Sequence, residues 1–247
     1  MNKVRALIAA MAGVASLGFA AAVHAAPTTY YGLDLSTGNT VPVGGNALTA
    51  RNAFLSGLTT VGTEQFEGLA IGTSTPLTLS FPGSTGNLTA TMSSTGGSVV
   101  VTNANPVGQY STSGSQHLDA GFGSTLTIDF SATPISAFGF YGTDISDSGG
   151  DLIASLTDIN DVVTSFTLIT NASGNNNNLL FWGFIDSGMS YKSVVLRNTS
   201  SSDRFGFDDM IIGDAGQVST VPEPASLALM GLALAGLCVA RRKQNQA

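Results

Sequence analysis

The chain has 247 residues, of which 43% are apolar and only 10% are charged, and its formal net charge is −7 at pH 7. A typical soluble domain carries roughly 25% charged residues, so this composition argues against a cytosolic helical protein. Residues 26–221 hold four basic side chains against fifteen acidic ones. Because affinity for phosphate backbones depends on clustered Lys and Arg, this balance argues against nucleic acid as a partner.

Residues 1–25 have the pattern of a secretory signal. Lys3 and Arg5 form a basic start, residues 7–19 are uncharged and largely apolar, and Ala25 ends a run of small or modest side chains. We expect export by the Sec machinery and cleavage by signal peptidase after Ala25. The alternative is an N-terminal membrane anchor. The alanine-rich residues before the cleavage point and the absence of a following stop-transfer pattern disfavour it.

The predicted exported domain, residues 26–220, begins with an edge strand at Thr28 to Leu33 and one short helix. Asn46 is the expected N-cap of a helix over residues 47–58. Leu48, Arg51, Leu55 and Leu58 fall on one side of this helix at helical spacing.

Short alternating or β-branched segments, separated by turn residues, follow the helix. Ten such candidate strands at close spacing predict an all-β sandwich. They cover residues 77–81, 88–92, 99–102, 126–130, 135–141, 152–157, 162–168, 180–185, 191–197 and 204–212.

Two aromatic pairs flank single glycines within these strands. Phe138 and Phe140 surround Gly139, and Phe205 and Phe207 surround Gly206. Alternation along a strand places both phenylalanines of a pair on one face, where they would fill the core, while the glycine allows close approach on the other face.

The last 27 residues, 221–247, have three parts. Pro222, Glu223 and Pro224 come first, then an apolar run over residues 225–240, and then the basic residues Arg241, Arg242 and Lys243. Sixteen helical residues rise about 24 Å, slightly less than the hydrocarbon core, and the basic side chains resist translocation. We therefore expect a transmembrane helix with the domain outside and the tail inside. Cys238, the only cysteine, lies in this helix, so the exported domain can form no disulfide.

These three parts, in this order and near the C-terminus, resemble the PEP-CTERM sorting signal of Gram-negative bacteria. The resemblance implies recognition and processing near the motif by a membrane-embedded exosortase. It also implies anchoring in the inner membrane in transit, and then a place on the cell surface or in an extracellular polysaccharide matrix or biofilm.

A second resemblance covers most of the exported domain. The order of Glu-Gln-Phe-Glu-Gly, Phe-Gly-Phe-Tyr-Gly and Phe-Gly-Phe-Asp-Asp along the chain is similar to that of ectodomains joined to such tails. Those ectodomains resemble jelly-roll or concanavalin-like sandwiches, which implies a fold and not a function.

Catalytic groups are scarce in the exported domain. His117 is its one histidine, and its polar, Ser- and Gly-rich surroundings predict a surface side chain. A Ser-His-Asp site is formally possible, but no Gly-x-Ser-x-Gly motif occurs. Glu64 and Glu67 could be named as the paired carboxylates of a glycosidase, but their spacing does not establish one. We expect no enzymatic activity.

Aspartates offer the main ligand chemistry. Asp144, Asp147 and Asp151 lie in a Gly- and Ser-rich connection, and Asp203, Asp208 and Asp209 surround the last strand. Either group could supply oxygen ligands to a structural calcium ion, with Asp208 or Asp209 as the anchor. The alternative is that these aspartates end strands and cap turns.

Two hypotheses follow for the function. The first is a non-enzymatic exported surface or matrix protein, sorted by exosortase and linked to exopolysaccharide. The second is a calcium-supported carbohydrate-binding module with the same tail. Trp182 and Tyr191 could stack on a sugar ring if they were exposed, with Asn175 to Asn178 as polar neighbours, although the apolar run around Trp182 favours burial.

Overall fold

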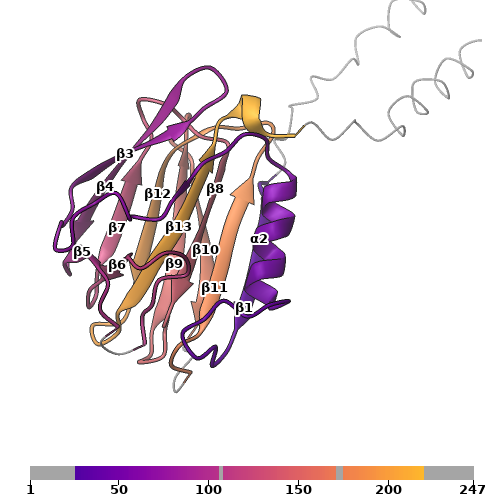
Figure 1. Cartoon of the computed structure of the whole chain (residues 1–247). Helices are drawn as coiled ribbons and strands as arrows, with labels where there is room; N and C mark the ends of the chain where they lie inside the picture. The colour runs from indigo at the N-terminus through magenta and orange to yellow at the C-terminus, as the bar shows by residue number, and fades with distance from the viewer. Residues whose placement is uncertain (1–25, 106–107, 171–174, 220–247) are drawn as a thin grey trace, which may run out of the picture.

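A computed structural model describes residues 26–105, 108–170 and 175–219. The sorting motif and the predicted signal and membrane helices lie outside these ranges. The described part is a two-layer β-sandwich with one α-helix, α2, on the outer face of one sheet (Figure 1). The predicted all-β sandwich with one short helix near its start is therefore confirmed.

Thirteen strands form the two sheets in the described ranges, and all paired neighbours run antiparallel. The first sheet has the order β1-β11-β8-β13-β6-β5, with β2 added on β13, and the second has the order β10-β9-β12-β7-β4-β3. The elements are β1 (Thr28–Asp34), α2 (Asn46–Ser56), β2 (Thr63–Glu64), β3 (Leu77–Pro82), β4 (Asn87–Thr95), β5 (Val99–Thr102), β6 (His117–Ala120), β7 (Thr125–Asp129), β8 (Ala137–Thr143), β9 (Asp151–Asp158), β10 (Val163–Thr170), β11 (Leu179–Ile185), β12 (Tyr191–Asn198), β13 (Phe205–Gly213) and the 3-10 turn η1 (Ala215–Gln217).

Alternating burial builds the core between the sheets. β3 and β9 bury every second residue, as a strand with one solvated face should. The four phenylalanines of the two Phe-Gly-Phe segments are fully buried, and the rings of Phe140 and Phe207 stack with centroids 4.8 Å apart. The predicted packing role of both segments is confirmed.

Three central strands, β8, β11 and β13, are buried at every residue. One face of each meets the core, so the other face must also be covered. The helix α2 covers the outer face of β1 and β11, and Phe54 packs there with its ring 5.6 Å from those of Tyr30 and Phe181. A second cover, residues 108–116, lies over β13 and β8 and is called the cover segment below.

The helix differs from its prediction in which face it buries. The buried residues of the helix are Ala47, Ala50 and Phe54, whereas Leu48 and Leu55 of the predicted row are only partly buried. Leu58 is buried but lies past the end of the helix. Its N-cap is Gly45, and the predicted cap Asn46 lies inside the helix. The carboxylate of Asp34 accepts the backbone N–H groups of Asn46 and Ala47 at 2.8 and 2.9 Å, so a side chain from β1 supplies the missing cap.

Gly32 explains how α2 lies so close to β1. A Cβ atom at Gly32 would stand 2.1 Å from the carbonyl oxygen of Asn46. Helix and strand therefore touch backbone to backbone, which only glycine permits. Sequence reasoning missed the two short strands β2 and β6, because β2 has only two residues and the four residues of β6, His-Leu-Asp-Ala, lack the β-branched side chains that mark β5.

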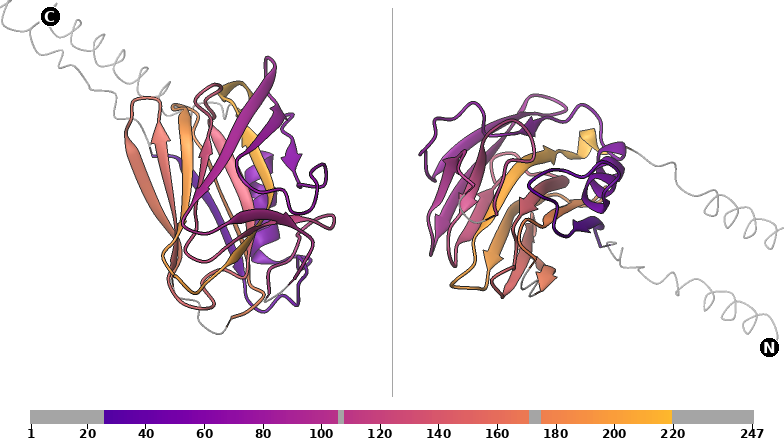
Figure 2. Two further views of the ribbon diagram at one scale, coloured as in Figure 1. Left: turned by 90° about the vertical axis from the view of Figure 1, so that its left-hand side faces the viewer. Right: turned by 60° about the horizontal axis from the view of Figure 1, so that its bottom comes forward.

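The first and the last described residues of the sandwich lie at the same end of the fold (Figures 1 and 2). Thr28 pairs with Ile185 at the start of β1, while the N–H of Ser219 donates to the carbonyl of Gly57 at 2.9 Å. Gly57 itself lies against the side chain of Ile185. The residues that precede the sandwich and those that follow it are therefore joined to neighbouring points of its surface.

Candidate functional site

The cover segment encloses the largest group of buried polar side chains on the outer face of the first sheet. Residues on β6, β13 and β8 that point away from the core include His117, Gly206, Asp208 and Thr143. The backbone N–H of Tyr110 donates to Oγ1 of Thr143 at 3.2 Å, which fixes the start of the cover on β8.

Asp208 and Asp209 hold the middle of the cover. Asp208 accepts hydrogen bonds from the backbone N–H and Oγ1 of Thr112 at 2.7 and 3.0 Å, and from the N–H of Ser113 at 3.3 Å. Asp209 accepts from the hydroxyls of Thr112 and Ser113 at 2.9 and 2.6 Å. A β-bulge between Asp208 and Ile211, with Asp209 at φ +49°, turns both carboxylates toward the cover.

Burial, together with the adjacent charge of Asp209, raises the pKa of Asp208 to about 7. Asp208 is fully buried and Asp209 is 3% exposed. Hydrogen bonds from Thr112 act in the opposite direction and favour the charged carboxylate. The carboxyl group of Asp208 therefore gains or loses its proton near neutral pH.

Glu67 holds the far end of the cover. Its carboxylate accepts the backbone N–H groups of Ser115 and Gln116, each at 2.6 Å, and the hydroxyl of Ser115 at 3.0 Å. These hydrogen bonds lower the pKa of Glu67. Glu64 makes a separate local contact and accepts the N–H of Phe66 at 2.6 Å. The two glutamates thus serve as structural acceptors at different places.

His117 is buried beneath the cover and only 1% exposed, so the expectation of a surface histidine is wrong. The reason is that its polar neighbours belong to the cover, whose partner strands are distant in sequence. Burial lowers the pKa of His117 to about 4, so the imidazole is neutral at pH 7. Neither ring nitrogen has a hydrogen-bond partner, so the possible Ser-His-Asp arrangement is not formed around it.

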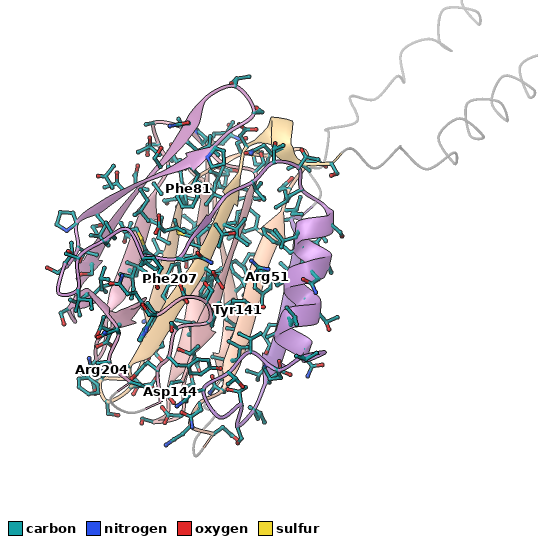
Figure 3. The ribbon with its side chains drawn as sticks, in the orientation of Figure 1. Arg51, Phe81, Tyr141, Asp144, Arg204 and Phe207 are labelled. Atoms are coloured by element: carbon teal, nitrogen blue, oxygen red, sulfur yellow. The ribbon has the colours of Figure 1, made fainter. Side chains whose placement is uncertain are left out.

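Gln109 and His117 meet over Gly206. A Cβ at Gly206 would lie 2.3 Å from Oγ1 of Thr143, 3.2 Å from Cδ2 of His117 and 3.4 Å from Cβ of Gln109. Both amide atoms of Gln109 and the hydroxyl of Tyr141 are buried without a partner. Arg51 of α2 lies over the ring of Tyr141, 5.8 Å from its centroid (Figure 3). The group formed by Gln109, His117 and Thr143 around Gly206 is called the polar seam below. It can donate and accept hydrogen bonds, and its imidazole is neutral at pH 7.

The six aspartates considered as calcium ligands do not share one contact. Asp208 and Asp209 lie under the cover, and Asp144 stands against Gly108 at its start. Asp147 hydrogen-bonds Asp203, and Asp151 begins β9. Among the described residues, no three His, Cys, Asp or Glu side chains are grouped so that they could hold a metal ion. Calcium binding at these residues stays a prediction.

Asp144 and Asp203 are buried carboxyl groups near the end of the sandwich opposite the chain exits. Burial raises the pKa of Asp144 to about 6, and burial with the hydrogen bond from Asp147 raises the pKa of Asp203 to about 7. Asp203 accepts from the N–H of Ser146 and from the side-chain amide of Asn198, both at 3.0 Å. Sequence reasoning named Asp203 but could not foresee its partners, since Ser146 follows β8 and Asn198 ends β12.

Trp182 and Tyr191 do not form a sugar-stacking surface. They are 2% and 4% exposed, and Tyr191 donates its hydroxyl to Asp186 at 2.7 Å inside the fold. Trp182 packs in the core against Phe138 and Phe166. Asn178 is also buried, where its amide holds the backbone of Ile145. The hypothesis that these rings display a flat face to a ligand is wrong, and the apolar run around Trp182 explains why.

The sorting residues Pro222, Glu223 and Pro224 and the basic residues Arg241, Arg242 and Lys243 lie outside the described ranges. The described ranges contain no helix with the length and hydropathy needed to cross a bilayer. The last described residues are well fixed: Asp214 caps η1 through the N–H groups of Gly216 and Gln217, and Val218 pairs with Leu58.

Comparisons with solved structures give only distant likenesses. The K2 cleaved adhesin domain of Lys-gingipain is 14% identical, with a TM-score of 0.41 over 62% of this chain and 97% of that one. The CBM22-1 xylan-binding domain of Paenibacillus barcinonensis Xyn10C is 15% identical, with a TM-score of 0.37 over 61% of this chain and 98% of that one. We conclude nothing about this chain from such low scores. No curated protein sequence matches the chain.

A family model does match the tail. It is described as the PEP-CTERM protein-sorting motif, and it covers residues 220–243, beginning directly after the last residue of the described sandwich. The match includes the Pro-Glu-Pro segment, the apolar run and all three basic residues. The chain therefore carries a PEP-CTERM protein-sorting motif at its C-terminus, which implies an exported, exosortase-processed cell-surface protein.

Proposed function

We propose that this protein is a non-enzymatic component of the cell surface or extracellular matrix of a Gram-negative bacterium, linked to exopolysaccharide or biofilm. Exosortase sorts and processes it through residues 220–243 after signal peptidase has removed residues 1–25. The observation that carries this proposal is the match of the tail to the PEP-CTERM motif.

The three parts of the tail divide the work of sorting. Residues 225–240 place the chain in the inner membrane, and Arg241, Arg242 and Lys243 keep the end of the tail on the cytoplasmic side. Pro222, Glu223 and Pro224 then present an extended segment at the membrane surface, since proline disfavours helix in the preceding residue. The described sandwich reaches Ser219, before the motif, so processing near the motif would remove none of its strands.

The structural role of the carboxylates supports a non-enzymatic function. Asp208, Asp209 and Glu67 each accept hydrogen bonds from the cover segment. In this role they hold a surface layer of the sandwich in place.

The experiment compares the intact mass and location of the protein in cells with and without exosortase, for the native chain and for Glu223→Ala. We expect loss of the tail near Pro222 only for the native chain in exosortase-competent cells. An unprocessed tail in both strains would overturn sorting and leave a C-terminally anchored membrane protein.

A calcium-supported carbohydrate-binding module with the same tail is the second candidate. The buried carboxyls of Asp144 and Asp208 favour it, because their raised pKa values are those of acids that a bound cation would help to ionise. Under this candidate, calcium and the producing cell's exopolysaccharide raise the melting temperature, and Asp208→Asn removes the calcium effect. If neither addition shifts the melting temperature, this candidate is wrong.

A further inference from the structure

The tip of the β9–β10 hairpin exposes a concentration of aliphatic surface. Ile159, Val162 and Val163 are 51%, 58% and 60% exposed, and they lie within five residues of one another. Five other large apolar side chains in the described ranges are similarly exposed, and no three of them lie within five residues of one another. Single exposed apolar residues are ordinary, but a local group of them marks an interaction surface.

This tip lies at the end of the sandwich from which the chain leaves toward its tail (Figure 2). A series of backbone hydrogen bonds follows that end. Ser136 N–H donates to the carbonyl of Gly213 at the end of β13, and Ile135 and Tyr191 exchange bonds. Ile159 N–H then donates to the carbonyl of Ser190 at 3.0 Å, which fixes the tip beside this row.

The distance from the fold to the membrane is short. Ser219 is bonded to Gly57, and only residues 220–224 separate it from the apolar run that starts at Ala225. A chain extends at most about 3.3–3.6 Å per residue, so these residues and the bonds at either end span at most roughly 20 Å. A domain held this closely cannot turn freely, and the end that carries Ser219 must face the bilayer.

We propose that the β9–β10 tip, Ile159 to Val163, enters the lipid interface of the inner membrane while the tail anchors the chain. The proposal rests on the proposed function, because it takes the apolar run to be a membrane span. Charge on this end limits the partner to a weakly charged lipid surface: Lys192 is paired with Asp161, and Asp129 and Asp214 add negative charge. Contact therefore comes from the aliphatic side chains.

The contact would set how the motif is presented. With the tip in the interface and the tail in the bilayer, the domain has two attachment points, so the end that carries Ser219 keeps one face toward the membrane. Glu223 and its neighbouring prolines then lie in the narrow space between the sandwich and the lipid, where a membrane-embedded enzyme must meet them.

The test uses the chain as signal peptidase would leave it, residues 26–247, in phosphatidylcholine vesicles, with Cys238→Ala removing the native thiol. Val162→Cys carries a fluorescent label, and Val43→Cys is the matched control. Val43 is fully exposed, and it lies in the connection from β1 to the start of α2, at the opposite end of the sandwich. Quenching by nitroxide lipid is measured only on protein that floats with the vesicles.

We expect quenching at position 162 to exceed that at position 43 by at least about twofold, and Ile159→Asp together with Val163→Asp to abolish the difference while flotation persists. Flotation with equal or no quenching at the two positions overturns the lipid contact and leaves the proposed sorting intact. Failure to float removes the membrane span itself, and with it both this inference and the anchoring step of the proposed function.

Discussion

The outer face of the seven-stranded sheet is covered in two different ways. Under α2, Phe54 meets Tyr30 and Phe181 ring to ring, and the contact is apolar. Under the cover segment, Asp208, Asp209 and Glu67 accept hydrogen bonds from backbone and hydroxyl groups. The same sheet therefore holds α2 mainly by apolar packing, with one carboxylate, Asp34, at the helix start, and it holds the cover segment mainly by carboxylates, whose charge depends on pH.

Removing the main side chain of the helical cover should have the largest effect. Phe54→Ala deletes a fully buried ring, and such truncations destabilise by about 3–5 kcal/mol. Urea unfolding at pH 5 and pH 8.5 should show the same loss at both values. Asn52→Ala, on the exposed side of the same helix, should change stability by less than about 0.5 kcal/mol. A strongly pH-dependent loss in Phe54→Ala would contradict the division between the two covers.

The second largest loss of stability is expected from adding a methyl group to the polar seam. Gly206→Ala places a methyl group against Oγ1 of Thr143, and overpacking of this kind destabilises by about 1–3 kcal/mol. In a double-mutant cycle, Gly206→Ala should lower the free energy of unfolding less in the Thr143→Ala background than in the native chain. Strict additivity of the two changes would show that the seam has room to spare.

Proton uptake by the polar cover should appear in the pH dependence of stability. The pKa of Asp208 is raised to about 7 in the fold, above its unfolded value. Its contribution is therefore fully present below the unfolded pKa, near 4, and is lost as pH rises through about 7. Asp144 and Asp203, with pKa values raised to about 6 and 7, act in the same direction.

We therefore expect the free energy of unfolding to fall between pH 5 and pH 8.5, and Asp208→Asn to reduce that fall by roughly 1–3 kcal/mol, since one pKa unit corresponds to about 1.4 kcal/mol. Urea titrations at the two pH values measure it. An equal fall in the native chain and in Asp208→Asn would assign the pH dependence to the other two aspartates.

The smallest effect belongs to the exposed end of the cover. Glu67→Gln should speed hydrogen exchange at the amides of Ser115 and Gln116, which Glu67 accepts. Because the pKa of Glu67 is lowered, its contribution is present above the unfolded value and lost as pH falls through the folded one. Exchange at Tyr110, which is held by Thr143, is the internal control. Unchanged exchange at Ser115 would mean that Glu67 does not hold the cover.

The comparison also shows what sequence alone can predict. The sandwich and the buried Phe-Gly-Phe segments could be predicted because the alternation of apolar and polar residues along a strand is a local pattern. The tail could be predicted because its three parts occur in a fixed order. The buried face of α2 was mispredicted because Ala47 and Ala50 are small side chains that suit a backbone contact at Gly32. A prediction from hydropathy favours leucine on the buried face, because hydropathy carries no information about how closely two backbones approach.

The cover segment could not be predicted for a related reason. Its residues are polar and lack period, and the carboxylates that hold Thr112 and Ser113 lie more than ninety residues away. His117 was therefore predicted to be a surface side chain, and the hydrogen bonds that Asp208 and Asp209 accept from the cover segment were not foreseen. Only the register of β13 with β6 and β8 brings these groups together.

The position of β13 has a mechanical consequence. This strand lies between β8 and β6 and leads through η1 into the tail. A pull on the tail of an anchored chain reaches β13 through η1 and the Val218–Leu58 bridge. The hydrogen bonds of β13 to both neighbours run across the strand, so a load along β13 is shared among them. Such a load shears many bonds at once and does not open them one by one, so the domain would resist being drawn off the cell by drag.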